Sequence, residues 1–249
     1  AYIFRNADDA LLLAGALRED MISRTYGRAE TADCRAENVS LVNGCAEFTA
    51  NIRGERVEVK LGVPGEHQVW NALAALGVAE AYGVPLDGAA SELSKFKGYR
   101  HRQQIFEHEG VLVIDDSYNA SPDSMRAALS ILREMKDRRR IAVLGDMKEL
   151  GAEEKELHRE IGAALAAAEG ADCVLTLGEL AGELAEAFRA HCKAPYSPEL
   201  GCFSEREELF EVLKEKVKPG DAILFKASNS MKFSELADYF SGQGERGAH

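Results

Sequence analysis

The chain has 249 residues, of which 46% are hydrophobic and 29% are charged, which is the composition of an ordinary globular protein. Thirty basic residues against 42 acidic ones give a net charge of −12, and the basic residues form no long block, so no nucleic-acid partner is expected. No apolar run reaches the roughly 18 residues that a membrane span needs. Five widely spaced cysteines without a C-x-x-C pair predict free thiols in a reducing compartment.

The first sixty residues predict mixed α/β structure that ends in antiparallel strands. A helix is expected over 8–17, because its acidic start suits a helix N-terminus and leucines follow at helical spacing. Asn43-Gly44 and Arg53-Gly54 separate alternating segments and are typical of hairpin turns. The expected strands are 2–4, 22–26, 39–42, 46–52 and 56–61.

The pattern becomes helical after Pro64-Gly65, which breaks the last of these strands. Two helices are predicted, over 69–82 and 86–96, and the first is rich in alanine and leucine. A polar connection follows and ends at Arg102. We therefore predict a domain boundary there, with a first domain of partly antiparallel strands plus helices over residues 1–102.

Residues 103–249 predict a second domain in which short apolar strands alternate with amphipathic helices. This alternation indicates a parallel sheet covered on both faces, so the fold class is α/β, doubly wound and Rossmann-like. The expected strands are 111–114, 141–144, 173–177, 201–203 and 222–225, and the expected helices are 122–135, 153–168, 180–192, 205–217 and 234–240. In such sheets ligands bind beyond the carboxyl ends of the strands, so the loops after the strands are the candidate sites.

The loop after the first of these strands carries two carboxylates, a phenol and an amide: Asp115, Asp116, Tyr118 and Asn119. Carboxylates can accept the hydroxyls of a ribose or hold a metal through water, and the helix beginning near Pro122 would favour an anion. Strand termination with ordinary helix capping explains the same residues equally well. The spacing alone leaves the two interpretations open.

Two later loops have similar polar character. Asp146 and Lys148 follow the second strand, where Gly145 allows close backbone approach to a ligand. Lys226 and Ser228 follow the last strand and could grip a carboxylate or a phosphate. For both loops the simpler interpretation is a strand-to-helix turn with capping, which we weigh somewhat above a binding role.

The start of the alanine-rich helix carries a further candidate, Asn71, whose amide could pair with the edge of an adenine. Two devices that usually accompany nucleotide binding are missing from the sequence: there is no G-x-x-x-x-G-K-[ST] phosphate loop and no G-x-G-x-x-G fingerprint. From the residues alone, the prediction stops at a two-domain α/β protein with polar loops.

Several of these segments together resemble the Mur ligases, and within them the branch that adds D-alanyl-D-alanine. The first domain carries N-A-D-D at 6–9 and a stretch at 64–75 that is similar to G-x-H-N-x-x-N-A-L-A-A, with His67 and Asn71 in matching places. The second carries D-D-S-Y-N-A-S-P-D-S-M at 115–125 and L-G-D-M-K-E-L-G at 144–151, which are long and specific to that branch. The resemblance covers nearly the whole chain.

The resemblance implies an ATP-driven ligase of peptidoglycan synthesis in the cytoplasm, with Mg²⁺ as a second cofactor. Its substrates would be a UDP-muramoyl-tripeptide, activated as an acyl phosphate, and D-alanyl-D-alanine. The implied nucleotide contacts are His67, Asn71, Arg102 and Asp116. The implied substrate contacts are Tyr118, Asn119, Asp146, Lys226 and Ser228.

The chain departs from the family pattern at three points. Gln68 stands where the family has asparagine, and the family's K-G-S-R appears as K-A-S-N at 226–229. The family's phosphate loop, its metal ligands and its modified lysine lie upstream of N-A-D-D. We therefore expect a C-terminal part that partners the missing N-terminal half, and that binds no metal and is inactive alone. The alternatives are a non-catalytic binding module of the same fold, or another ligase of the superfamily such as a folylpolyglutamate or cyanophycin synthetase.

Overall fold

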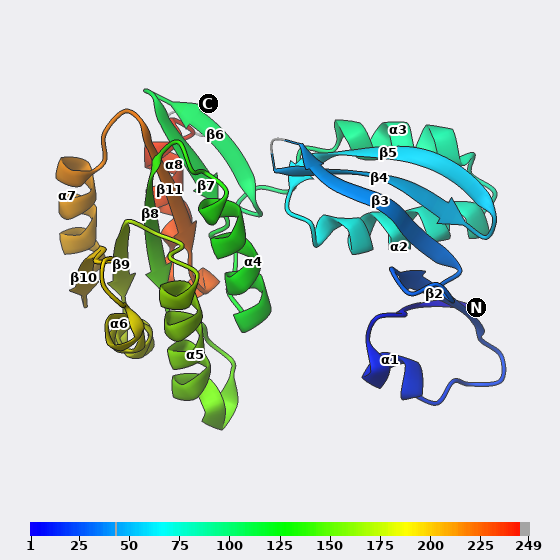
Figure 1. The fold of residues 1–249 in the computed structure, drawn as a ribbon, viewed down its shortest axis with the longest axis horizontal. Coiled ribbons are helices and arrows are strands. Elements are labelled where there is room, and N and C mark those ends of the chain that lie inside the picture. The colour runs from blue at the N-terminus through cyan, green and yellow to red at the C-terminus, as the bar shows by residue number, and fades with distance from the viewer. Residues whose placement is uncertain (43, 245–249) are drawn as a thin grey trace. The chain divides into compact units, whose positions relative to one another are not determined.

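The computed structural model describes residues 1–42 and 44–244, which fold into two compact units that meet at the boundary between Lys97 and Gly98 in the sequence. We refer to them as the N-terminal and the C-terminal unit. The predicted α/β class is confirmed, because each unit combines one sheet with helices (Figure 1). No helix within the described residues has the length and apolar character needed to cross a bilayer.

The N-terminal unit is built on a five-stranded sheet in the order β1-β2-β3-β4-β5. Its strands are β1 (Tyr2–Asn6), β2 (Ile22–Gly27), β3 (Cys34–Val42), β4 (Cys45–Ile52) and β5 (Glu55–Pro64). The first three run parallel and the last three antiparallel, as the hairpin signal at Arg53-Gly54 predicted. The other predicted turn includes residue 43, which lies outside the described residues.

Helices α2 (Gln68–Ala81) and α3 (Leu86–Lys95) form the core of the N-terminal unit together with its sheet. Their apolar side chains pack on β3, β4 and β5, where every second residue of β4 is buried. Alternating burial in the strands and helical spacing in α2 are the two patterns that the sequence showed, so these elements are confirmed.

The predicted helix over 8–17 is wrong in extent. Helix α1 covers only Ala10–Ala14, with the Asp9 carboxylate capping Leu11 and Leu12, and none of its residues is buried. A helix this short has no tertiary packing to offset the cost of nucleation, so it ends at Gly15.

The C-terminal unit is a six-stranded sheet in the order β10-β9-β8-β11-β7-β6, parallel except for the β6–β7 pair. Its strands are β6 (Gln104–His108), β7 (Val111–Asp115), β8 (Arg139–Gly145), β9 (Cys173–Leu177), β10 (Glu199–Phe203) and β11 (Asp221–Lys226). The five predicted strands are confirmed. The edge strand β6 was missed, because it contains only two apolar residues, Ile105 and Phe106.

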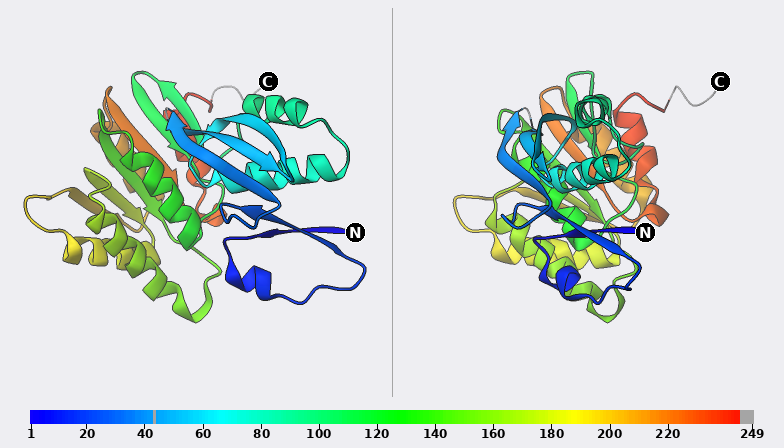
Figure 2. Two further views of the ribbon diagram at one scale, coloured as in Figure 1. Left: turned by 45° about the vertical axis from the view of Figure 1, so that its right-hand side comes forward. Right: turned by 90° about the vertical axis from the view of Figure 1, so that its right-hand side faces the viewer.

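Two apolar layers cover the two faces of this sheet, as expected of a doubly wound fold. One layer contains α4 (Pro122–Arg133), α5 (Glu154–Ala167) and α6 (Glu179–His191), and the other contains α7 (Arg206–Lys216) and α8 (Phe233–Phe240). Figure 2 shows these layers from two further sides. Short 3-10 turns, η1 (Gly151–Glu153) and η2 (Asn229–Met231), precede α5 and α8.

Candidate functional site

The three polar loops of the C-terminal unit follow three neighbouring strands. Strand β11 lies between β7 and β8, so Asp115, Gly145 and Lys226 end side by side at the carboxyl edge of the sheet. The chain returns from β10 to the middle of the sheet to place β11 there, and this reversal of strand order is where such folds bind ligands. We call this place the three-loop edge, formed by residues 115–121, 146–150 and 226–229.

A buried ion pair joins the first and third loops. Lys226 Nζ lies 2.5 Å from Asp116 Oδ2, and the side chains are 1% and 9% exposed. The same ammonium donates to the Asn119 carbonyl at 3.1 Å, while the Gln103 amide donates to the other Asp116 oxygen at 3.2 Å. Burial raises the pKa of Asp116 and lowers the pKa of Lys226, although the attraction between them opposes both shifts.

The burial of this pair bears on two predicted contacts. Asp116 was expected to meet a ribose and Lys226 a substrate carboxylate or phosphate, yet both side chains point into the unit and bond to each other. Each Asp116 oxygen already accepts a hydrogen bond. The direct contacts therefore stay predictions, and this geometry argues against them.

The second and third loops are clamped together by reciprocal hydrogen bonds. The Ser228 amide donates to the Asp146 carbonyl at 3.0 Å, and the Lys148 amide donates to Ser228 Oγ at 2.7 Å. The Lys148 ammonium reaches back to Asp146 Oδ2 at 2.7 Å. Ser228 is 3% exposed, so its hydroxyl serves this clamp and not the open surface.

Asp146 also caps the N-terminus of helix α6. Its Oδ1 accepts the amide of Ala181 in the first turn of α6 at 2.8 Å, and the side chain is 5% exposed. An acceptor there satisfies a backbone donor that the helix cannot pair internally. The turn interpretation of this loop thus accounts for Asp146, while its predicted substrate contact stays a prediction.

Helix α6 can meet this carboxylate because Gly178 precedes it. Gly178 has φ 111°, and a Cβ there would lie 2.3 Å from Asp146 Oδ1. We expect Gly178→Ala to lower the free energy of unfolding by about 1–3 kcal/mol through backbone strain alone. Gly182→Ala is the matched control, since its Cβ meets no atom within 4 Å and alanine favours a helix. Urea denaturation of the two variants checks this; equal stability would contradict the account.

The exposed polar side chains at or beside the three-loop edge include Arg102, Tyr118, Asn119 and Lys148. The Arg102 guanidinium stacks on the Tyr118 ring, with its carbon 4.1 Å from the ring centroid. Asn229 donates to the Tyr118 carbonyl at 3.1 Å and so ties this loop to the third loop. A cation on an aromatic face next to an exposed amide can bind an anionic or peptide-like group.

The N-terminal unit places its candidates around the start of α2. Asn71 is exposed and its amide donates to Gln68 Oε1 at 2.9 Å, while His67 precedes the first turn. An exposed amide there fits contact with a base edge, and Arg102 in the other unit fits contact with a phosphate.

A network that the sequence did not reveal holds the N-A-D-D turn to the same helix. The Trp70 indole donates to Asp8 Oδ2 at 2.6 Å, and the amides of Arg28 and Ala29 donate to the same carboxylate. Burial acts to raise the pKa of Asp8, but these hydrogen bonds outweigh it and lower the pKa. Asp8 therefore serves as an ionised anchor for the turn.

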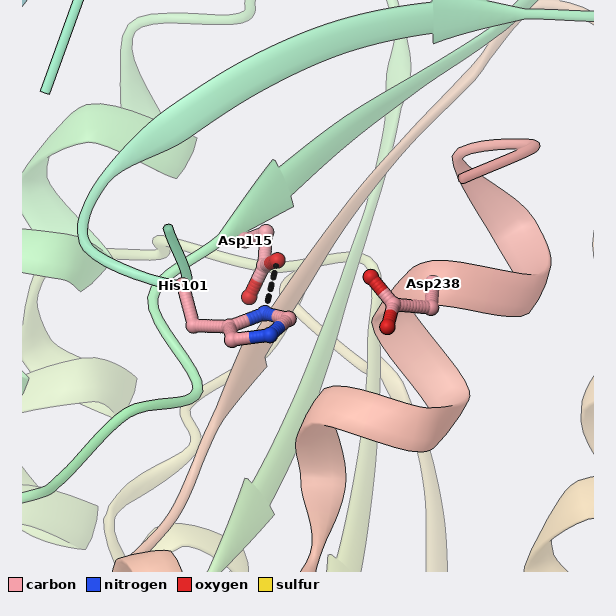
Figure 3. Close-up of side chains that lie close together, drawn as sticks. All are labelled: His101, Asp115 and Asp238. Carbon is pink, nitrogen blue, oxygen red and sulfur yellow. Dashed lines mark hydrogen bonds and ion pairs between the residues drawn. The ribbon is translucent and has the colours of Figure 1, made fainter. Parts of the chain in front are cut away.

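One cluster in the described part of the chain has the composition of a metal site: His101, Asp115 and Asp238. Figure 3 shows the His101 ring bonded to Asp115, at 2.8 Å from Nδ1 to Oδ2, with Asp238 facing the same ring. Asp115 also accepts the Ser117 hydroxyl at 2.6 Å, and Asp238 pairs with Arg100 at 2.8 Å. Mg²⁺ prefers oxygen ligands in an octahedron, so this occupied, mixed donor set does not fit it.

One buried histidine and the five cysteines lie outside the three-loop edge. His158 is fully buried, where it accepts a hydrogen bond from the Met147 amide and bonds to the Glu154 carbonyl, so it has a structural role. The five cysteines are free, and burial raises the pKa of Cys34 and of Cys173 to about 11. These two thiols are therefore poor nucleophiles.

The chain matches the models of two domains of one protein family. The model of the Mur ligase glutamate ligase domain matches residues 101–229, and that of the Mur ligase middle domain matches residues 1–79. The chain belongs to the Mur ligase family.

Similar curated proteins from several bacteria share one name. The chain is 33% identical over 216 residues to UDP-N-acetylmuramoyl-tripeptide–D-alanyl-D-alanine ligase of Bacillus subtilis, covering 86% of this chain and 46% of that protein. It is 38% identical over 179 residues to the Escherichia coli protein of the same name, covering 70% and 39%. The chain thus spans about half the length of the curated relatives it matches. These names do not favour the binding module or the folylpolyglutamate and cyanophycin synthetases.

Solved structures agree with this assignment. MurF of Acinetobacter baumannii superposes with a TM-score of 0.80 at 26% identity, covering 97% of this chain and 52% of that one. MurF of Thermotoga maritima, crystallised with ADP, gives a TM-score of 0.71 at 27% identity, covering 92% and 50%.

Proposed function

We propose that this chain forms the C-terminal half of an ATP-dependent ligase that joins D-alanyl-D-alanine to a UDP-N-acetylmuramoyl-tripeptide. The observation that carries the proposal is the three-loop edge, where the two branch-specific motifs at 115–125 and 144–151 begin at the ends of β7 and β8, the strands on either side of β11. The names of the relatives supply the substrates. The work of the enzyme would take place in the cytoplasm, where free cysteines persist.

The residues that we assign to ligands are exposed or half-buried. Asn71 would contact the adenine, with His67 beside it, and Arg102 the phosphates. Tyr118 and Asn119 would meet the incoming dipeptide. ATP supplies the phosphoryl group that activates the substrate carboxylate, and this chain's residues then act by positioning and charge neutralisation.

The phosphate-binding loop and the ligands of Mg²⁺ are assigned to the other half of the ligase. These 249 residues contain no G-x-x-x-x-G-K-[ST] sequence, and the one candidate metal cluster in the described residues does not fit Mg²⁺. The N-terminal half is therefore the partner on which the proposed activity depends.

The experiment is a product assay on the ligase extended upstream of this chain, given ATP, Mg²⁺, the UDP-tripeptide and D-alanyl-D-alanine. The expected product is the UDP-pentapeptide, identified by mass. Asn71→Ala should raise the KM for ATP about tenfold through loss of one base contact worth about 1–3 kcal/mol. Val78→Ala, on an exposed position of the same helix, is the control. Absence of product from the unaltered ligase would refute the proposal, and an unchanged KM would refute the role of Asn71.

A further inference from the structure

Lys226 is the most deeply buried charged side chain of the three-loop edge, and it ends the strand at the middle of the sheet. Strands β7 and β8 flank β11, so the side chain has packed structure on both sides and is 1% exposed. Its position after an apolar strand made it a candidate to grip a substrate. The burial shows that the ammonium faces the protein.

The Lys226 ammonium donates to three acceptors in the first loop. Nζ lies 2.5 Å from Asp116 Oδ2, 3.1 Å from the Asn119 carbonyl and 3.5 Å from the Asp116 carbonyl. An ammonium carries three N–H groups, so these three acceptors use its whole capacity. Nothing is left on Lys226 to bind a ligand without releasing the loop.

These acceptors lie at both ends of a short segment, 116–119, whose exposed members are Tyr118 and Asn119. Within the segment, the Tyr118 carbonyl accepts a further hydrogen bond from the side-chain amide of Asn229. Lys226 and Asn229 belong to the same loop, so that loop fixes the backbone of 116–119 at three carbonyls. This attachment holds the backbone from which the Tyr118 and Asn119 side chains extend.

We propose that Lys226 is a positioning residue, which holds the segment 116–119 in the conformation that presents Tyr118 and Asn119 to the substrate, and that it does not touch the substrate itself. This inference rests on the proposed function, because it assigns those two side chains to the ligand. It gives a role to a lysine whose charge is penalised by burial.

Chemical labelling of the 249-residue chain tests the placement of Lys226. Limited acylation of amines, followed by peptide mass spectrometry, should modify Lys226 at least about tenfold more slowly than Lys148, because a buried amine reacts only after local opening. Lys148 is the matched control, since it lies on the neighbouring loop with its side chain 47% exposed. Added D-alanyl-D-alanine should leave the Lys226 rate unchanged. Labelling of Lys226 as fast as Lys148, or its protection by the dipeptide, would overturn the proposal.

Kinetics of Lys226→Met in the extended ligase test the positioning role. Activity is expressed per folded molecule, with the folded fraction taken from circular dichroism, so that lost stability is removed from the comparison. We expect kcat/KM for the dipeptide to fall about 10- to 100-fold through misplacement of the contact residues. Lys95→Met, on an exposed ion pair of the N-terminal unit, should keep full activity. Unchanged kcat/KM per folded molecule would reduce Lys226 to a stabilising residue and overturn the proposal.

The labelling and kinetic experiments distinguish failure of this inference from failure of the proposed function. If the unaltered extended ligase makes no product, the proposed function fails, while the labelling contrast between Lys226 and Lys148 still reports whether the ammonium is sequestered. If product forms and the labelling contrast is absent, the positioning role alone fails.

Discussion

Lys226→Met is expected to lower the free energy of unfolding of this chain by about 3–5 kcal/mol, because it leaves the Asp116 carboxylate buried without its partner. Asp116 accepts from the ammonium at 2.5 Å and is 6% exposed as a residue, so water cannot replace the lost cation. Urea denaturation monitored by circular dichroism measures the change. The double variant Asp116→Asn with Lys226→Met should recover most of the loss, since it removes the unpaired charge. A single variant as stable as the double would contradict this account.

The stability lost in Lys226→Met should depend on pH with a definite sign. Burial already raises the pKa of Asp116, and removing the opposing attraction of Lys226 raises it further. A carboxyl whose folded pKa lies above its unfolded value of about 3.9 stabilises the folded state at low pH, and this contribution is lost as pH rises through the folded pKa. The deficit of the variant relative to the unaltered chain should therefore shrink from pH 7 to pH 5. A deficit that grows on acidification would contradict the assignment.

Asp146→Ala is expected to cost about 2–4 kcal/mol, because it removes a helix cap and leaves the Ala181 amide without its acceptor. The carboxylate is 5% exposed and bonds at 2.8 Å to that amide. Asp146→Asn keeps an oxygen acceptor and should cost less. Lys148→Met removes a half-exposed ammonium but leaves the hydrogen bond from the Ala181 amide to Asp146, so it should cost about 0–1 kcal/mol. Thermal unfolding of the three variants measures the order; equal losses for Asp146→Ala and Lys148→Met would contradict the capping role.

Much of the secondary structure could be predicted from the sequence because its periodicity was strong. The alternation in β4 and the continuous apolar runs of β7, β8 and β11 report burial on one face or on both faces of a sheet. Helix α1 and strand β6 were misjudged because their extent depends on tertiary packing and on pairing with β7, which local pattern does not encode.

The composition of the three-loop edge was predicted, but its internal bonding was not. Loops that follow parallel strands lie at one edge of a sheet, so their proximity was predictable. The insertion of β11 between β7 and β8 was not, because it pairs segments that are far apart in the sequence. This insertion brings Lys226 next to Asp116, which lies 110 positions earlier in the sequence. Two residues that were predicted to contact ligands therefore form a buried ion pair. His101 and Asp238 meet for the same reason, from segments far apart in the chain.

The central claim is that this chain contributes residues to the nucleotide site of a ligase but cannot bind the nucleotide tightly alone. Calorimetry of ATP binding in the presence of Mg²⁺ tests this claim most directly. The titration compares the 249-residue chain with a version extended upstream to include a phosphate-binding loop. We expect tight binding by the extended version only, because backbone amides of that loop supply the main phosphate contacts. Comparable binding by the short chain would contradict the claim and would place a complete nucleotide site within these residues.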